Sequence, residues 1–166
     1  TPPTPPTPAA PVNVWPRQKD VLVYYGKPGA NQTMLASPYP MKLAWDNSKV
    51  INKFSVHEKV HDSMARVLKR ALDHYGLAEI QRLNLDQWGG CLNVRKMRGG
   101  NNYSMHSWGI AIDIDPSNNQ LRWGSDRAHM ARKDRLPFVK LWEEEGWLSL
   151  GRERNYDWMH FQAARL

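Results

Sequence analysis

The sequence predicts a small α+β domain with a central antiparallel sheet flanked by helices. Apolar residues recur at helical spacing over residues 55–75, whereas residues 109–115 and 157–162 alternate apolar and polar side chains as strands do. These elements do not follow a regular strand–helix–strand order, which favours α+β over a parallel α/β fold. The chain has 166 residues, enough for one domain with a hydrophobic core and too few for two domains of usual size.

Composition favours a packed globule with an anionic partner. Hydrophobic residues make up 41% of the chain and include 8 Trp, whereas disordered chains are poor in aromatic residues. The formal net charge of +7 favours nucleic acid, anionic lipid or an acidic polymer such as a cell wall. The basic residues form short scattered pairs without interleaved aromatic side chains, so we expect no nucleic-acid partner. No apolar run approaches the roughly 18 residues that a membrane span needs.

Residues 1–14 are predicted to form a Thr/Pro-rich linker. The repeat TPPTPPTPAAP favours extended polyproline geometry and cannot bury a core. Such a linker suggests an N-terminal module outside this sequence. The chain also begins at Thr1 without a basic and apolar leader, so any secretion signal is expected outside it. The folded domain is expected over residues 15–166.

Four segments are predicted to be extended. Residues 21–25, VLVYY, are β-branched and aromatic and precede the turn signal GKPG, so they should form a strand or an extended arm. Residues 41–45, MKLAW, alternate as a half-buried strand does. The alternating segments 109–115 and 157–162 complete the expected strands.

Two helices are predicted. The apolar positions of residues 55–75 share one helical face, and Gly76 provides the stop. A second helix over residues 137–145 begins with Pro137 in its first turn and should end at Gly146.

A familiar zinc-protease motif lies at the start of the first predicted helix. His57-Glu58-x-x-His61 has the spacing that places two histidines and a general base on one helical turn. The neighbours of such a motif are normally uncharged and buried, because all three side chains must face a cleft. Here Lys59 lies inside the motif and Asp62 follows it, which indicates a solvent-facing flank.

Two further features argue against this motif. Ser55-x-x-Glu58 is a capping box, which gives Glu58 a structural role at the predicted helix start. The extended form of the zinc motif needs Gly and His at the positions of Met64 and Val67. We therefore interpret the two motif histidines as helix-surface or packing residues.

A second group of residues, two histidines and one aspartate, forms a better candidate for a zinc site. His106 and Asp113 lie in SMHSWGIAID, where Gly109 allows the chain to turn before a strand that carries Asp113. His160 lies on the other expected strand, residues 157–162. If these strands pair, two imidazoles and one carboxylate converge into a three-ligand zinc site with its fourth position open for water.

Metal-assisted chemistry also needs a base and a charge stabiliser. Asp157 lies three residues before His160, so it reaches the site only if it occupies the bend that enters the strand. Arg95 and Arg98, in NVRKMRGG, are candidates for binding a developing oxyanion or a substrate carboxylate. Asp115 is an alternative ligand, which we expect instead to form a turn or support the site.

These motifs resemble those of the M15 zinc peptidases, which cut peptidoglycan stem peptides. The shared pattern is S-x-H-x-x-G-x-A-x-D, from Ser104 to Asp113, followed later by acidic-x-x-His at residues 157–160. The closest similarity is to the D-alanyl-D-alanine carboxypeptidase-like branch found in phage endolysins. GGC-x-N-x-R-x-x-R-G before the motif and GWxSLGRxRNYDWMHFQ after it are similar to that branch too. The likeness covers most of residues 15–164.

The resemblance implies a zinc-binding set and a small group of supporting residues. The implied ligands of one Zn²⁺ ion are His106, Asp113 and His160. It also implies Asp157 as the catalytic base, with Arg95 favoured over Arg98 as the electrostatic helper and Ser104 supporting the site by hydrogen bonding. Many relatives have Glu where this chain has Asp157, so the base here is one methylene shorter.

We therefore expect a zinc-dependent, endolysin-like peptidoglycan peptidase, either an endopeptidase or a D,D-carboxypeptidase, that hydrolyses a stem-peptide amide with metal-activated water. The alternative is a zinc-stabilised module that binds cell wall or protein without catalysis. An acid at position 157 argues for catalysis, because a purely structural zinc site closes its fourth position with a protein ligand. The expected protein is a monomer that acts at the bacterial cell wall, in the periplasm or outside the cell. The linker fits a catalytic module joined to an N-terminal wall-binding module.

Overall fold

The computed structural model describes residues 13–97 and 99–166, so Arg98 and most of the predicted linker lie outside the described residues. The main elements in chain order are α1 (Val21–Tyr25), β1 (Gln32–Leu43), β2 (Asp46–His57), α2 (His61–Arg82), β3 (Gln87–Gly90), β4 (Ala111–Ile114), α3 (Leu136–Glu144), β5 (Leu148–Ser149), α4 (Leu150–Arg154) and β6 (His160–Gln162). Short 3-10 helices lie between them: η1 (Gln18–Asp20), η2 (Met105–Trp108), η3 (Pro116–Asn118), η4 (His129–Ala131) and η5 (Lys133–Arg135).

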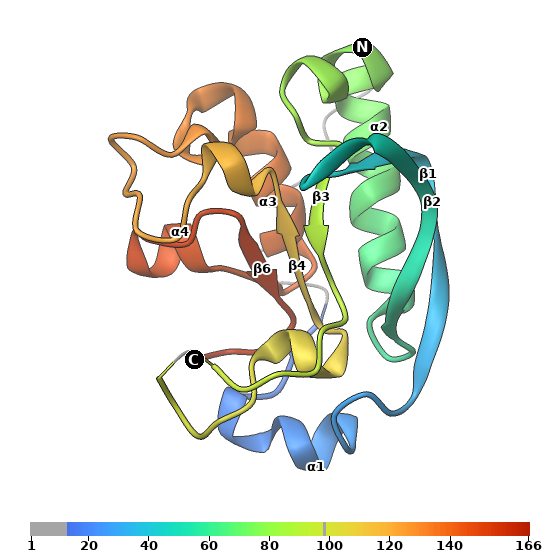
Figure 1. The fold of residues 1–166 in the computed structure, drawn as a ribbon, viewed down its shortest axis with the longest axis vertical. Helices are drawn as coiled ribbons and strands as arrows, with labels where there is room; N and C mark the ends of the chain where they lie inside the picture. The colour runs from blue at the N-terminus through green and yellow to red at the C-terminus, as the bar shows by residue number, and fades with distance from the viewer. Residues whose placement is uncertain (1–12, 98) are drawn as a thin grey trace.

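The sheet has six strands in the order β2-β1-β3-β4-β6-β5. Every neighbouring pair is antiparallel except β1 and β3, which run parallel. The predicted α+β class is confirmed, but the sheet is mixed and not wholly antiparallel. The parallel pair is short, and the chain reaches it through α2 and not through a tight turn, as parallel pairing requires. Figure 1 shows α2 lying along the long, curved β1–β2 hairpin.

The first predicted helix begins later than expected. Residues 55–57 form the end of β2, and α2 starts only at His61. The predicted capping box does not form, because the Ser55 hydroxyl donates instead to Gln32 Oε1 at 3.2 Å and no side chain caps α2. Gly76 interrupts the helix as predicted, with φ 76° and ψ 158°, but a further stretch of helix continues to Arg82.

The segment VLVYY is helical and not extended. In α1, Val21 and Tyr25 are buried whereas the three residues between them are exposed, which is the spacing of one helical face. The Tyr25 hydroxyl donates to Ala163 O at 2.7 Å. Tertiary packing of these two side chains therefore outweighs the β-propensity of the sequence.

The other predicted elements form with modest changes in their bounds. Residues 41–45 supply the end of β1, which stops at Leu43 before a turn. The two alternating segments supply β4 and β6, each shorter than predicted. Helix α3 lies within one residue of its prediction, and Gly146 follows it with φ 85°.

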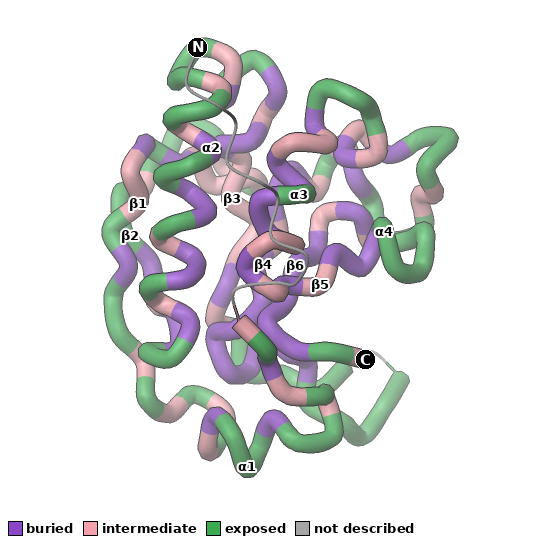
Figure 2. Tube along the Cα trace, turned by 180° about the vertical axis from the view of Figure 1, so that it is seen from behind, coloured by how far each residue is buried: buried purple, intermediate pink, exposed green. Residues whose placement is uncertain are grey.

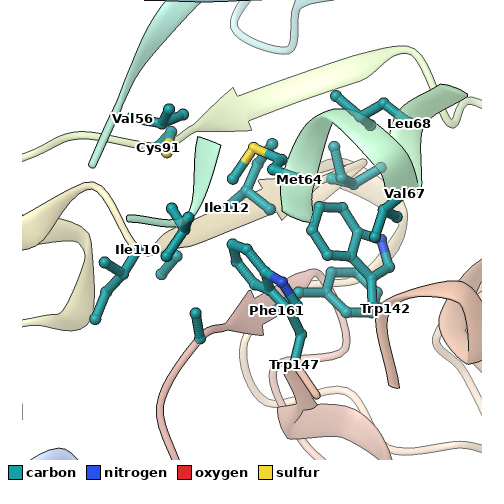
Figure 3. Packing of buried hydrophobic residues seen from close by; sticks show 14 of the residues in the cluster. Val56, Met64, Val67, Leu68, Cys91, Ile110, Ile112, Trp142, Trp147 and Phe161 are labelled. Atoms are coloured by element: carbon teal, nitrogen blue, oxygen red, sulfur yellow. The ribbon is translucent and has the colours of Figure 1, made fainter. Parts of the chain in front are cut away.

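The hydrophobic core lies on one face of β4 and β6. Ile112 and Phe161 are fully buried, and Phe161 stacks on Trp142 of α3 with ring centroids 5.2 Å apart. Figure 3 shows these side chains packed with Met64 and Val67 of α2. Figure 2 shows burial along the chain: the central strands contain buried segments, whereas the outer turns are largely exposed. Because side chains alternate along a strand, the remaining positions of β4 and β6 face the other side.

A buried carboxylate, Glu145, ties the start of the described chain to α2 and α3. It follows α3 and accepts hydrogen bonds from the side chains of Asn13, Ser63 and Arg66, at 2.8 to 3.0 Å. Its backbone carbonyl also accepts from Trp15 Nε1 at 3.0 Å. Burial alone would raise the pKa of Glu145, but the bonds from Arg66 and Ser63 outweigh it and lower the pKa.

None of the helices in residues 13–97 and 99–166 combines the length and hydropathy required to cross a bilayer.

Replacing Glu145 by Ala should destabilise the fold by about 3 kcal/mol, because buried donors lose their acceptor and Arg66 loses its partner. Urea unfolding measures this change. Glu144→Ala is the matched control: Glu144 pairs with Arg70 near the surface, and its loss should cost less than about 1 kcal/mol. Equal losses in the two variants would contradict the role given to Glu145.

The effect of Glu145→Ala should also depend on pH. A carboxylate whose pKa is lower in the folded state stabilises the fold above its unfolded pKa, and this stabilisation is lost as the pH falls through the folded pKa. The difference in unfolding free energy between the natural chain and Glu145→Ala should therefore shrink as the pH falls below about 4.

Candidate metal centre

His106 is held in a short turn immediately before β4. The Ser104 hydroxyl accepts the His106 backbone N–H at 3.3 Å and caps η2. Gly109 ends η2 in the left-handed region, with φ 69° and ψ 30°. A Cβ at Gly109 would lie 2.5 Å from Gln32 Oε1 and 2.9 Å from the His57 backbone nitrogen, so both space and backbone conformation require glycine there.

The β4–β6 register brings Asp113 and His160 together. These two residues are direct partners in the antiparallel pair, with Ile112 opposite Phe161 as the next pair. Directly opposite side chains share a face of the sheet. Since Ile112 and Phe161 point into the core, Asp113 and His160 lie on the face away from it.

Three predicted ligands converge on this face. His106 Nε2 lies 3.2 Å from one carboxylate oxygen of Asp113, and His160 Nδ1 lies 3.2 Å from the other. One ligand atom from each side chain lies within 4.8 Å of the others. Both histidines are buried and Asp113 is partly buried. Within residues 13–97 and 99–166, this is the group of His, Cys, Asp or Glu side chains suited to a metal ion.

The second nitrogen of His106 is committed to the backbone. Its Nδ1 lies 2.8 Å from the carbonyl oxygen of Cys91. A carbonyl only accepts, so Nδ1 must carry the proton and donate. In the neutral imidazole, Nε2 is then unprotonated, and its lone pair faces Asp113.

Gln162 imposes the opposite tautomer on His160. The Gln162 side-chain amide donates through Nε2 to Ala164 O at 3.0 Å and to Gln18 Oε1 at 2.8 Å. Its oxygen therefore faces His160 Nε2 at 2.8 Å and accepts a proton from it. In the neutral His160 imidazole, Nδ1 is therefore unprotonated, and its lone pair faces Asp113.

The resulting set of acceptors calls for a positive charge between them. Burial alone would raise the pKa of Asp113, but positive charge on the His106 and His160 rings, when they are protonated, outweighs it and holds the pKa well below its usual range. Burial would lower the pKa of His160, but the Asp113 carboxylate favours the protonated ring and raises the pKa overall, so in the metal-free chain a proton on Nδ1 takes the place that a cation would occupy. Two nitrogen lone pairs and one carboxylate at this spacing are the donor set that Zn²⁺ prefers, so the residues fit that ion.

Asp157 lies in the turn that enters β6. It adopts φ 53°, its backbone N–H donates to Leu121 O at 2.8 Å, and its carbonyl accepts from the His160 N–H at 3.0 Å. Asp157 therefore occupies the bend before β6, the position from which it was expected to reach the site. Burial raises the pKa of its carboxyl, although His160 opposes the shift. Asp157 and the three predicted ligands line one cavity of about 870 Å³.

Arg95 lines the same cavity with an exposed side chain. Its backbone is fixed by Ser107, whose hydroxyl accepts from the Arg95 N–H at 3.0 Å and donates to the Arg95 carbonyl at 2.8 Å. Arg98, the other predicted helper, lies outside the described residues. Ser104 is buried beside the site, and its contact with His106 is to the backbone and not to the imidazole.

The zinc-protease motif does not assemble. His57 ends β2 and His61 begins α2, so the two lie on different elements. His57 Nδ1 accepts from the Lys59 N–H at 3.0 Å and its Nε2 lies 2.7 Å from Tyr25 O, which leaves neither nitrogen for a metal. His57 is a packing residue, as predicted, although it packs at the end of a strand and not on a helix.

Asp115 is turn-forming, one of the two roles expected for it. It is buried with φ 54° before η3, and its carboxylate accepts from Asn118 Nδ2 at 2.9 Å. It is absent from the metal-ligating group found among the described residues. Of these two neighbouring carboxylates, Asp113 is the one that lies in that group.

The orienting groups were not identified from the sequence. Gln162 lies two residues after His160 on the same strand face, which is a usable signal for a supporting partner. The Cys91 contribution is a backbone carbonyl, so no side-chain pattern reveals it.

Comparison with known proteins identifies one family. Residues 98–163 match the family model described as D-alanyl-D-alanine carboxypeptidase. The matched stretch contains His106, Asp113, Asp157 and His160. Neither a curated protein nor a solved structure matches the chain.

His160→Ala should abolish stoichiometric zinc binding, because two protein ligands remain of three. Metal analysis after dialysis against zinc measures the outcome. His61→Ala, a partly exposed histidine whose Nδ1 contacts Asp62, is the control and should retain one zinc per chain. Loss of zinc in the His61 variant alone would contradict the site.

Gln162→Leu should lower zinc affinity by about 10- to 100-fold, because His160 Nε2–H loses its acceptor and the imidazole loses its orientation. Gln162→Glu keeps an acceptor and should lose less. Chelator competition measures affinity, and the exposed Gln81→Leu serves as the control. Long-range ¹H–¹⁵N spectra of the zinc-free chain, recorded at a pH at which the His160 ring is neutral, should place its proton on Nε2. A proton on Nδ1 would refute the assigned tautomer.

Proposed function

We propose that this chain, an M15 family peptidase by its match over residues 98–163, is a zinc-dependent enzyme that hydrolyses an amide bond in the stem peptides of peptidoglycan. The observation that carries the proposal is the convergence of His106 Nε2, His160 Nδ1 and the Asp113 carboxylate on one cavity. A purely structural zinc site would surround the ion with protein ligands, whereas these three side chains line an open cavity.

Zinc, when bound, supplies a Lewis acid that activates water and polarises a carbonyl oxygen. His106 and His160 contribute neutral nitrogen ligands, each held by a bond from its other ring nitrogen. These bonds fix the direction of both lone pairs before the metal arrives, which reduces the cost of ordering the site.

Asp157 is proposed as the group that takes a proton from the attacking water and returns it to the leaving amine. Two features support this assignment. The carboxyl lines the same cavity as the metal ligands, and its raised pKa favours proton transfer near neutral pH. The turn at φ 53°, in which the Asp157 carbonyl accepts from the His160 N–H, adds support because it holds the Asp157 backbone close to His160.

Arg95 is proposed to stabilise negative charge that develops on the carbonyl oxygen, or to bind a substrate carboxylate. The positive charge of Arg95 slightly lowers the pKa of Asp157, which supports a position of Arg95 near the reacting groups. The exposed side chain can move, whereas its backbone is anchored by Ser107.

The setting proposed for this activity is the bacterial cell wall, as in an endolysin, with the chain acting as a monomer beside an N-terminal wall-binding module. The net charge of +7 supports attraction to an anionic wall.

Digestion of purified peptidoglycan tests the proposed reaction. The zinc-loaded chain should release new amino termini, which mass spectrometry assigns to one stem-peptide bond. Asp157→Asn should keep one zinc per chain and lose about 10²- to 10⁴-fold in rate, because the proton acceptor is gone. Intact wall material in the presence of the zinc-loaded chain would favour a non-catalytic binding module instead.

A further inference from the structure

A second cavity lies beside the metal centre. Its volume is about 960 Å³, close to that of the site cavity at about 870 Å³. The two cavities share the lining residues Gln18, Met97, Met105 and Leu166. Because these residues border both, the two cavities adjoin between the metal centre and α1; together they are called the groove, and they offer room for more substrate than the groups at one scissile amide.

Two segments distant in sequence line this second cavity. One is the N-terminal stretch formed by η1 and α1. The other comprises residues 95–97 and 99–104, where Lys96 pairs antiparallel with Tyr103 and the Met97 N–H donates to Asn102 O at 2.8 Å. Residues of this segment line both cavities, so it borders the whole groove.

The lining combines apolar surface with hydrogen-bonding amides. Val21, Met105 and Trp108 are buried apolar residues of the second cavity, and Leu22 is an exposed one. The exposed side chains of Asn101 and Asn102 line it too. This mixture suits a peptide, which presents small alkyl side chains together with backbone amides.

The charged side chains of the second cavity are all basic. Arg17 and Lys19 line it with exposed side chains, and the described lining contains no Asp or Glu. Arg17 Nη1 donates to Leu166 O at 3.0 Å, and neither basic residue forms an ion pair with a described side chain. Arg17 keeps guanidinium N–H donors besides the one that binds Leu166, and together with Lys19 it favours a carboxylate ligand at the edge of the apolar groove.

We propose that the second cavity is a substrate subsite that binds a free carboxylate of the stem peptide through Arg17 and Lys19, away from the scissile bond. The inference rests on the proposed function, because it assumes that a peptide occupies the metal-centre cavity. It adds the chemical class recognised: an acidic peptide segment whose carboxylate lies at the α1 end of the groove.

Calorimetric titration of two synthetic stem peptides tests this subsite. One peptide carries a free mid-chain carboxylate, and the other is identical except that this group is a carboxamide. The zinc-loaded chain with Asp157→Asn prevents turnover and should bind the acid at least about tenfold more tightly than the amide. Arg17→Glu/Lys19→Glu in the same background should remove this preference while zinc content and melting temperature stay unchanged.

The matched control is Lys53→Glu/Lys140→Glu, which makes the same change in net charge at exposed positions on β2 and α3. It should keep the preference for the acid. Equal binding of acid and amide by the parent, no binding of either peptide, or the same loss in the control would overturn the inference.

Failure of the subsite and failure of the proposed function are distinguishable. A chain that digests peptidoglycan but ignores the carboxylate retains the proposed function and loses the subsite. A chain that binds the acidic peptide through Arg17 and Lys19 but leaves peptidoglycan intact loses the catalytic proposal instead.

Discussion

The candidate metal centre depends on one backbone register, in which Asp113 lies opposite His160 across the β4–β6 pair. A slip of one residue would move either side chain to the opposite face of the sheet. The same register places Ile112 against Phe161 in the core. Burial of these apolar side chains therefore specifies the alignment that the polar side chains need, and stability and chemistry share one structural constraint.

Hydrogen bonding then decides what the aligned side chains can do. The Cys91 carbonyl and the Gln162 amide each occupy one ring nitrogen of a histidine, on opposite atoms of the ring. The remaining nitrogens both face the two oxygens of Asp113. An acceptor set of this kind is costly to bury without a cation, because the lone pairs repel and lose their water. The side chains at this site thus fit a divalent metal ion.

Much of the site could be predicted from the sequence because its residues lie in short motifs with clear spacing. Strand alternation put Asp113 and His160 where they would meet if the two strands paired, and the turn at Gly109 placed His106 beside them. Placing Asp157 depended on a bend that the sequence allowed but did not require. Gln162 acts through a side-chain amide whose orientation depends on Ala164 and on residues at the other end of the chain, which only the folded structure brings together.

The errors in the fold came from competition between local and tertiary preferences. Residues 21–25 have high β-propensity, yet packing of Tyr25 against Ala163, just after β6, made them helical. Residues 55–57 continue a strand whose alternation runs directly into the helical pattern of α2, so the boundary was set too early. The parallel β1–β3 pair depends on the path of α2, which no local pattern encodes.

Anomalous diffraction at the zinc absorption edge, from crystals of the zinc-loaded chain, tests the central claim most directly. One peak is predicted within about 2.0–2.2 Å of His106 Nε2, His160 Nδ1 and an Asp113 oxygen. A peak beside His57 or His61, or none near Asp113, would contradict the proposed centre.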